Sequence, residues 1–275
     1  MQRKIWYNKD MDSLWNKSSL QIYKALNGQV RLVGGCIRDY LLRRPVHDRD
    51  MTTPLTPDEV EKALKKAKID FISIGKKYGT ITAKIDGEAY EITTLRKEEK
   101  HDGRHAEMTW TTSYKTDALR RDFTINALSA DVKDKIFDYT TGRSDLAQGL
   151  VRFIGDPEKR IQEDYLRILR YFRFWSAISS LDLDSNVLQA CKRHKKGLEI
   201  LSADRIRDEL FRLFCTPRAE EALLAMKKVG VLTSKMLTLD FSKKQMQILK
   251  KMEKEKLLAK IGFLNFKGGK NDHSK

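Results

Sequence analysis

Cysteine and long apolar stretches are both scarce in this sequence. The chain holds only Cys36, Cys191 and Cys215, an odd number at wide spacing with no Cys or His ligand pair nearby. Such a pattern is typical of reduced thiols and argues against a disulfide framework or a zinc site. No apolar run approaches the ~20 residues that a membrane helix needs, and residues 1–10 lack the apolar core of a secretory signal. These absences predict a cytoplasmic protein without a membrane anchor.

Acidic residues are also outnumbered. The 275 residues include 54 Lys and Arg against 38 Asp and Glu, which gives a formal net charge of +16 and a pI near 9.6. A cationic excess of this size favours a polyanionic partner, because each neutralised phosphate releases condensed counterions. An anionic membrane surface would use the same charge, but no stretch pairs a basic helix face with a lipid-facing one. The composition therefore favours a nucleic acid as partner.

The order of the predicted elements divides the chain into two kinds of structure. Turn signals and capping residues predict helices at 11–26, 35–42 and 57–67. Short apolar and alternating runs predict strands, namely 30–33, 46–52, 71–74, 80–85, 89–95, 136–139 and 151–154. From Asp117 the pattern becomes mostly helical, and beyond Asp156 almost entirely so. The predicted fold class is therefore α+β, with an N-terminal α+β domain followed by an all-helical part.

Two glycines follow the first predicted strand. Gly34 and Gly35 lie between a strand and a helix, where a missing side chain lets the backbone approach a phosphate and the helix N-terminus favours its charge. Arg38, one turn into that helix, adds a fixed cation. Most diglycine turns are simply turns, so this motif alone is weak evidence for a phosphate site.

Asp48 and Asp50 give a stronger signal. Residues two apart on a strand point to the same side, so both carboxylates converge on one spot. Converging carboxylates repel each other unless a cation lies between them, and Mg²⁺ with its substrate phosphates is usually held in this way. The alternative is a solvated strand edge with acids beside Arg49. The preceding diglycine favours the metal site, with Asp48 and Asp50 as catalytic metal ligands.

These motifs resemble the signature of the polymerase β-type nucleotidyltransferases. More narrowly, residues 32–39 followed by Asp48-x-Asp50 are similar to the family of class II tRNA CCA-adding enzymes and bacterial poly(A) polymerases. Four further segments follow in the family's order, at 120–128, 138–152, 163–167 and 203–209, the last with Asp204 where the family usually has Glu. The resemblance implies a polymerase β-like head with a mixed sheet and flanking helices, then an all-helical neck and a shortened body. The corresponding divisions are residues 1–140, 141–212 and 213–275.

The resemblance also implies roles for single residues. Arg121 and Asp122 would contact the phosphates and the ribose, with Asp122 accepting from a 2′-OH; the alternative is a charge pair at a helix start. Glu91 stands where related enzymes often keep a third carboxylate, and an exposed strand Glu is an equal alternative. Asp102 and Arg104 belong to a loop that helps to switch from C to A addition in the resembling enzymes. Its His residues match no familiar zinc spacing.

A charged helix face supports the segment that resembles the family's base-reading element. At 100° per residue, Arg160, Asp164 and Arg167 fall within about 60° of one another, and Arg170 and Arg173 continue the stripe. A carboxylate flanked by guanidiniums suits the edge of cytosine or adenine, whose amino donor lies beside a ring acceptor. The alternative is an exposed face with ordinary i,i+3 and i,i+4 ion pairs. The opposite side is apolar, with Ile161, Tyr165, Ile168, Leu169 and Phe172.

Within the family, the sequence predicts template-independent addition of CCA to the 3′ end of tRNA from CTP and ATP. CC-only addition, A-only addition and poly(A) synthesis are alternatives, and the loop with Asp102 and Arg104 argues against a CC-only enzyme. A non-catalytic RNA-binding protein is disfavoured, because such a protein would gain no affinity from two carboxylates, Asp48 and Asp50, that face an RNA phosphate. Members of the family generally continue well past residue 275, so either the protein is naturally shortened, or a protein partner or a second chain supplies the missing region. The Lys-rich stretch 250–275 would partly replace that region, or would be an ordinary solvated tail.

Overall fold

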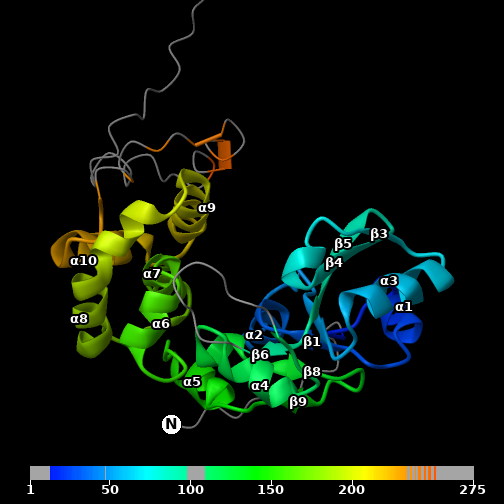
Figure 1. Cartoon of the computed structure of the whole chain (residues 1–275). Coiled ribbons are helices and arrows are strands. Elements are labelled where there is room, and N and C mark those ends of the chain that lie inside the picture. Colours follow the sequence, from blue (N-terminus) through cyan, green and yellow to red (C-terminus); the bar gives the residue numbers. More distant parts are fainter. Residues whose placement is uncertain are drawn as a thin grey trace, which may run out of the picture. The chain divides into compact units, whose positions relative to one another are not determined.

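The computed structural model describes residues 13–46, 48–97 and 109–233, together with single positions between 236 and 251. The chain forms two compact units, residues 1–144 and 145–275 (Figure 1). All strands of the described part lie in the first unit, and the second unit is built from helices. The predicted α+β class is confirmed. The three-part division of the chain after residues 140 and 212 stays a prediction.

The first unit is built on a seven-stranded mixed sheet with the strand order β3-β4-β5-β2-β1-β8-β9. β2 runs parallel to β5, and the other neighbouring strands are antiparallel. A separate two-stranded ladder joins β6 and β7. The strands are β1 (Arg31–Val33), β2 (Met51–Thr53), β3 (Asp70–Ile72), β4 (Thr80–Ile85), β5 (Glu88–Thr94), β6 (Arg96–Lys97), β7 (Thr109–Trp110), β8 (Ser129–Ala130) and β9 (Ile136–Phe137).

Helices α1 and α3 lie together over one face of this sheet (Figure 1). Their apolar sides share a core with the central strands, where Ile22, Leu64, Ile81 and Ile92 are fully buried. Burial of such side chains is the main favourable term in folding. The helical elements of this part are α1 (Lys17–Ala25), α2 (Gly35–Leu41), α3 (Pro57–Lys66), α4 (Tyr114–Leu119) and α5 (Gly142–Gln148), with the 3-10 turns η1 (Lys76–Tyr78) and η2 (Thr124–Asn126).

Local signals in the sequence set several of these boundaries. Thr56 caps α3 in a reciprocal capping box and Pro57 occupies its first turn, so this helix begins where the sequence predicts. Asp86 and Gly87 both have positive φ, 53° and 79°, as the two-residue turn of a tight hairpin requires. β4 and β5 are therefore the predicted hairpin.

The structure departs from the sequence predictions in several places. The first helix begins at Lys17 rather than at residue 11. β2 begins only at Met51 rather than at residue 46. Residues 151–154 contain a single isolated bridge at Phe153 instead of a strand. The stretch after Asp117 contains the short α4, a 3-10 turn and β8 rather than continuous helix. Because β8 pairs with β1, tertiary pairing decides its conformation over local preference.

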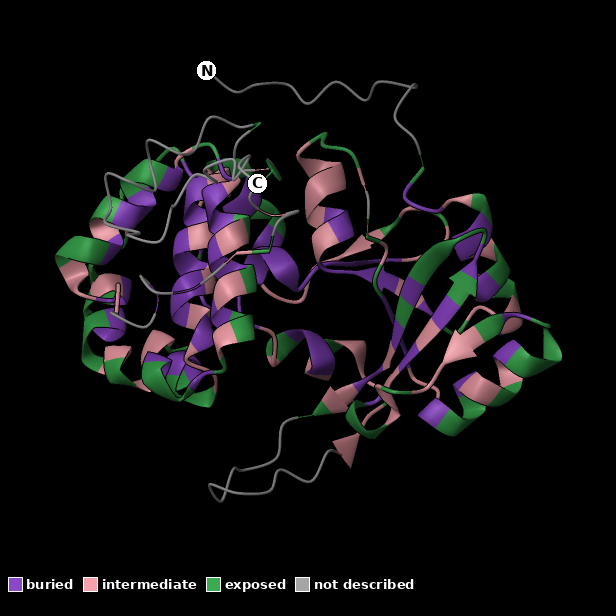
Figure 2. Cartoon of the chain, turned by 90° about the horizontal axis from the view of Figure 1, so that it is seen from above, coloured by how far each residue is buried: buried purple, intermediate pink, exposed green. Residues whose placement is uncertain are grey.

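The second unit is helical throughout its described part. α7 packs against α6, α9 and α10, and Figure 2 shows buried residues concentrated along these packed helices. None of the helices in the described part of the chain has the length and apolar character that crossing a bilayer requires. The elements are α6 (Pro157–Glu163), α7 (Leu166–Ile178), α8 (Ser185–His194), η3 (Lys195–Ile200), α9 (Ala203–Phe214) and α10 (Ala219–Val229).

Candidate active site

The turn between β1 and α2 brings two guanidiniums close to the diglycine. Gly34 has φ 76° and ψ −120°, a conformation that glycine adopts far more readily than other residues. Its N–H donates to the carbonyl of Leu128 over 2.9 Å. A Cβ placed on Gly34 would lie 3.7 Å from Nη1 of Arg121, and one placed on Gly35 would lie 3.6 Å from Nη2 of Arg38. Both cations that the sequence predicts for phosphate binding therefore lie beside this turn.

Asp39 and Asn126 both hold the guanidinium of Arg38. Its Nε and Nη2 donate to the carboxylate of Asp39 at 3.1 Å each, and its Nη1 donates to Oδ1 of Asn126 at 2.8 Å. Asn126 donates in turn from Nδ2 to Oδ1 of Asp122 at 3.3 Å. Asp122 and Asn126 are both buried. The structure thus fixes Arg38 as predicted, but pairs its charge with Asp39 and links it to the predicted ribose-binding carboxylate.

Arg121 is held by a buried carboxylate that the sequence analysis did not single out. Asp117 accepts from Nη2 of Arg121 at 2.9 Å through Oδ2, and from Nε and Nη2 of Arg120 at 2.8 and 2.6 Å through Oδ1. Burial by itself would raise the pKa of Asp117, but the charges of Arg121 and Arg120 outweigh it and lower that pKa below its usual value. The i,i+3 and i,i+4 spacing was the available signal in the sequence.

Asp48 and Asp50 immediately precede β2. The N–H of Val33 donates to the carbonyl of Asp50 at 2.9 Å, so the ladder between β1 and β2 continues through Asp50. Both aspartates are exposed. Arg49 between them turns elsewhere, because its Nε donates to the carbonyl of Leu14 at 2.7 Å. This alternation agrees with the expectation that the two carboxylates share one side.

Asp50 also lies in the electrostatic neighbourhood of the diglycine turn. Cys36, in the first turn of α2, is buried, and burial raises the pKa of its thiol to about 12 with a further contribution from the negative charge of Asp50. The thiol is therefore protonated at neutral pH and is not a nucleophile. The hydrogen bond from Val33 to Asp50 places the backbone of Asp50 beside the residue that precedes the diglycine.

The two aspartates suit a hard divalent cation. Mg²⁺ prefers oxygen ligands, and in nucleotide enzymes one or two carboxylates commonly hold it together with substrate phosphates. Within the described ranges, no three His, Cys, Asp or Glu side chains lie close enough to hold a metal by themselves. A cation at Asp48 and Asp50 would therefore take its remaining ligands from phosphate and water.

Glu91 lies on the strand next to Asp50. The parallel register pairs Met51 with Ile92, so one step back along both strands places Asp50 opposite Glu91. Both residues are exposed, and residues opposite each other on parallel strands point to the same face. The carboxylates of Asp48, Asp50 and Glu91 do not form a metal-binding group among the described residues, so the role of Glu91 as a third carboxylate stays a prediction.

In the second unit, the predicted base-reading residues do not lie on one helix. α6 ends at Glu163 and α7 begins at Leu166, and Asp164 between them has an extended backbone with φ −155° and ψ 106°. The prediction of one continuous charged helix face is therefore wrong. Oδ1 of Asp164 accepts from the N–H of Leu166 at 3.1 Å, and such bonds compete with the helical pattern.

The ion pairs around this break include pairs of the alternative kind, since Glu163 pairs with Arg160 at i,i+3 and with Arg167 at i,i+4. Asp164 pairs with Arg205 of α9 over 2.8 Å, rather than with Arg167. Arg167 pairs with Glu163, and its Nη1 donates to the carbonyl of Arg160 at 2.8 Å. Arg205 belonged only to a family-like segment in the sequence analysis. Because it lies 41 residues from Asp164, spacing along the chain gave no sign of the contact.

The rest of the predicted stripe lies along α7. Arg173 pairs with the buried Glu209 of α9, and its guanidinium lies 3.9 Å from the centre of the Phe174 ring. The guanidinium of Arg170 lies 5.4 Å from the same ring, within the range of a cation–π contact. The apolar side of the stripe is confirmed, since four of its five residues are fully buried, namely Ile161, Ile168, Leu169 and Phe172. Asp102 and Arg104 lie outside the described residues.

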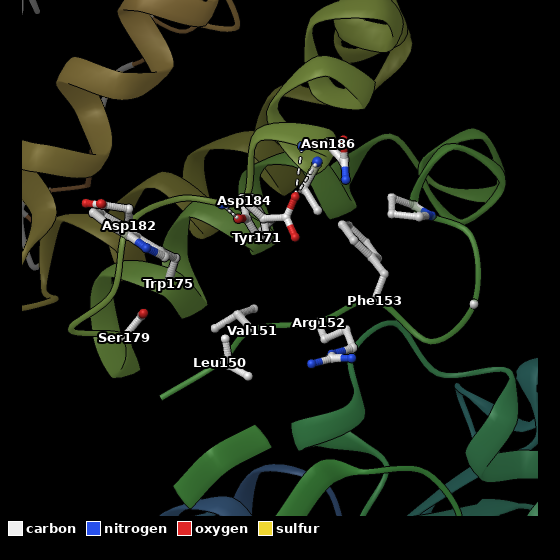
Figure 3. Close-up of a pocket in the computed structure, with 13 residues that line it drawn as sticks. Leu150, Val151, Arg152, Phe153, Tyr171, Trp175, Ser179, Asp182, Asp184 and Asn186 are labelled. Carbon is white, nitrogen blue, oxygen red and sulfur yellow. Dashed lines mark hydrogen bonds between the residues drawn. The ribbon is translucent and has the colours of Figure 1, made fainter. Parts of the chain in front are cut away.

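A pocket of about 480 Å³ lies elsewhere in the second unit (Figure 3). Its wall includes Tyr171 and Trp175 of α7 and Asp184, which caps α8 by accepting from the N–H of Asn186 at 2.8 Å. The N–H of Asp184 donates to Oη of Tyr171 at 3.0 Å. None of the residues predicted for catalysis or nucleotide binding lines this pocket, so it is separate from the candidate site.

Comparisons with known proteins agree with the order of the motifs. Residues 30–152 match the family described as poly A polymerase head domain, and residues 180–240 match the family described as probable RNA and SrmB-binding site of polymerase A. The mitochondrial CCA tRNA nucleotidyltransferase 1 of Mus musculus is 39% identical over 218 residues, which cover 78% of this chain and 50% of that protein. The CCA-adding enzyme of Staphylococcus saprophyticus is 40% identical over 199 residues, which cover 72% of this chain and 49% of that protein. The chain thus spans about half the length of the curated relatives it matches.

The fold is also similar to solved structures of this family. The Bacillus stearothermophilus CCA-adding enzyme in complex with CTP matches with a TM-score of 0.73 and 30% identity, covering 94% of this chain and 60% of that chain. The family matches, the sequence identities and the shared fold all indicate the same family. The chain therefore belongs to the family of class II CCA-adding enzymes and poly(A) polymerases, within the nucleotidyltransferases.

Proposed function

We propose that this protein is a tRNA nucleotidyltransferase that adds CCA, or part of it, to the 3′ end of tRNA from CTP and ATP. The observation that carries the proposal is the pair of guanidiniums, Arg38 and Arg121, beside a diglycine turn whose preceding residue, Val33, is hydrogen-bonded to the exposed Asp50. The names of the relatives support it, since they are CCA-adding enzymes and one of them was solved with CTP. The net charge of +16 suits a polyanionic substrate.

In this proposal the reaction is an in-line displacement. The 3′-oxygen of the tRNA forms a bond to the α-phosphorus of the nucleotide, the bond from that phosphorus to the bridging oxygen breaks, and pyrophosphate leaves. Asp48 and Asp50 would hold Mg²⁺, which when bound neutralises negative charge on the attacking and leaving oxygens. Glu91 would add a third carboxylate beside Asp50.

The chain's own groups would bind and orient the nucleotide. Gly34 and Gly35 leave room for the triphosphate to approach the backbone, and Arg38 and Arg121 meet its charge in fixed positions. Asp122 would accept from the ribose 2′-OH and so favour ribonucleotides. Hydrogen bonds to Asn126 and Asp117 orient Arg38, Arg121 and Asp122 before the nucleotide binds.

Base choice would come from the second unit. We assign Asp164 and Arg167 to the amino and ring-acceptor edge shared by cytosine and adenine. Arg205 would orient Asp164 through their 2.8 Å ion pair. Arg170 would add positive charge beside the base, whereas Arg173, paired with Glu209, would mainly support α7. The loop with Asp102 and Arg104 stays the predicted switch from C to A addition.

The names of the relatives favour CCA addition over poly(A) synthesis. A protein partner, a second chain and a cytoplasmic location stay predictions of the sequence.

Incorporation of CTP and ATP into a tRNA that ends at the discriminator base tests the proposal. We expect products longer by up to three nucleotides with both substrates, and no long A tract. Asp48→Ala and Asp50→Ala should each abolish incorporation while tRNA binding and the melting temperature stay near the wild-type values. Activity within about tenfold of wild type in either variant would contradict the metal-ligand assignment.

A further inference from the structure

Asp117 is a buried carboxylate that the proposed reaction does not use directly. It lies on α4, and only 3% of its side chain is exposed. Both of its oxygens accept hydrogen bonds from guanidiniums, Oδ1 from Arg120 and Oδ2 from Arg121. A buried carboxylate is costly unless it is paired in this way. These guanidiniums, together with the N–H of Arg96 that donates to Oδ1 at 3.4 Å, explain why Asp117 can remain charged there.

The two guanidiniums bound to Asp117 have different surroundings. Nε of Arg120 also donates to the carbonyl of Arg96 at 3.2 Å, so Arg120 is tied to the backbone of β6. Burial lowers the pKa of Arg120 to about 10, which still leaves it protonated at neutral pH. The three side chains together carry one net positive charge. Of the two guanidiniums, that of Arg121 is the one that lies beside the diglycine turn.

The geometry of Arg121 follows from its bond to Asp117. A guanidinium is planar and rigid, so fixing Nη2 also fixes the direction of Nη1. Nη2 is held by Asp117 at 2.9 Å, and Nη1 lies 3.7 Å from the position that a Cβ on Gly34 would take. The carboxylate therefore sets where Arg121 presents its charge.

We propose that Asp117 is a positioning residue that holds the guanidinium of Arg121 against the diglycine turn, ready for the triphosphate of the incoming nucleotide. The inference rests on the proposed function, because it takes the turn as the phosphate site. Asp117 does not touch the nucleotide; it removes the freedom that a long Arg side chain would otherwise lose on binding. The competing view is a buried ion pair that only stabilises the fold around α4.

Binding of inorganic tripolyphosphate and of CTP to the full chain, measured by calorimetry with Mg²⁺ and without tRNA, separates these views. Asp117→Asn keeps the size of the side chain, but its single carbonyl oxygen cannot serve both guanidiniums. We expect the Kd for both ligands to rise about tenfold, as the loss of an oriented charge-assisted contact implies. Asp58→Asn is the matched control, because Asp58 pairs with Lys76 in the same unit at 2.8 Å but is 70% exposed. This control should bind both ligands as wild type does.

A double-mutant cycle tests whether Asp117 acts through Arg121. If it does, Asp117→Asn should change tripolyphosphate binding little once Arg121→Gln is present. Should Asp117→Asn fail to fold, Asp117→Ala combined with Arg120→Gln removes one charge of each sign, and it leaves no side-chain acceptor at position 117 for Arg121. The expected loss of affinity is the same in that variant.

The outcomes also separate this inference from the proposed function. An unchanged Kd in the Asp117 variants, a loss that adds fully to that of Arg121→Gln, or a wild-type chain that does not bind tripolyphosphate overturns the inference. A wild-type chain that elongates tRNA while its Asp117 variants keep their affinity leaves the function standing and removes the positioning role. A shifted Kd in a chain that never elongates tRNA supports the positioning role and removes the function.

Discussion

The two glycines of the β1–α2 turn should respond in opposite ways to the same substitution. Gly34 has φ 76° and ψ −120°, whereas Gly35 is the first residue of α2 and has no positive φ. Alanine at position 34 would have a strained backbone, whereas alanine at position 35 adopts an ordinary helical conformation. The pair therefore allows the demands of folding to be separated from those of nucleotide binding.

Gly34→Ala should destabilise the protein through its backbone conformation. The added Cβ meets only ordinary neighbours, the carbonyl of Asn126 at 3.6 Å and Arg121 at 3.7 Å, so little of the cost is steric. Holding an L residue in this region costs about 1–3 kcal/mol. For a unit of this size, each kcal/mol should lower the melting temperature by about 2–4 °C.

Gly35→Ala should leave the fold intact and weaken nucleotide binding. Its Cβ would lie 3.6 Å from Nη2 of Arg38, an ordinary contact, and alanine gains up to about 1 kcal/mol over glycine in a helix. The melting temperature should therefore stay constant or rise. The same Cβ occupies space between the backbone and Arg38, where the proposed phosphate must lie, so CTP affinity should fall by about tenfold or more, or at least about 1.4 kcal/mol.

The assay pairs thermal unfolding with calorimetric binding of CTP in the presence of Mg²⁺. Gly87→Ala is the control, because Gly87 shares the positive φ of 79° at the β4–β5 turn and has no atom within 4 Å of its Cβ position. It should lose stability like Gly34→Ala and bind CTP like wild type. Wild-type CTP affinity in Gly35→Ala would refute the phosphate role of the turn, and a loss of stability there would show that Gly35 serves the fold.

Three further predictions follow from the described contacts. Asp164→Ala should lower the ratio of CTP to UTP incorporation, because a site that binds an amino group then no longer rejects a carbonyl; an unchanged ratio with lower activity would instead place Asp164, with its partner Arg205, in the scaffold. Glu91→Gln should lower the rate of incorporation without changing tRNA affinity, and wild-type kinetics would identify it as a surface residue of β5. Cys36, whose pKa burial raises to about 12, should resist thiol reagents at pH 8 in the folded protein while the half-buried Cys215 reacts; rapid labelling of Cys36 would contradict the packing of α2.

Features that depend on residues close together in the chain could be predicted from the sequence. Thr56 and Pro57 mark the start of α3, and Asp86-Gly87 marks the β4–β5 hairpin, because capping and positive-φ turns depend on neighbours within a few residues. The diglycine and the Asp-x-Asp motif were equally visible, since their spacing of one and two residues fixes how they present backbone and carboxylates.

Contacts between residues that lie far apart in the chain could not be predicted in the same way. The periodicity from residue 160 to 173 continues through the break at Asp164, because α6 and α7 both turn apolar sides inward. The break depends on the bond from Leu166 to Asp164 and coincides with the ion pair to Arg205. A pattern of residue types carries no record of such contacts between separate helices.

The sequence by itself determined the family motifs, the order of the elements and the chemical types of the candidate site. Only the tertiary structure decided that Arg38 and Arg121 lie beside the same turn and that Asp117 holds one of them. The physical reason is that local propensities act over a few residues, whereas the register of a sheet and the pairing of buried charges are set by the packing of the whole unit.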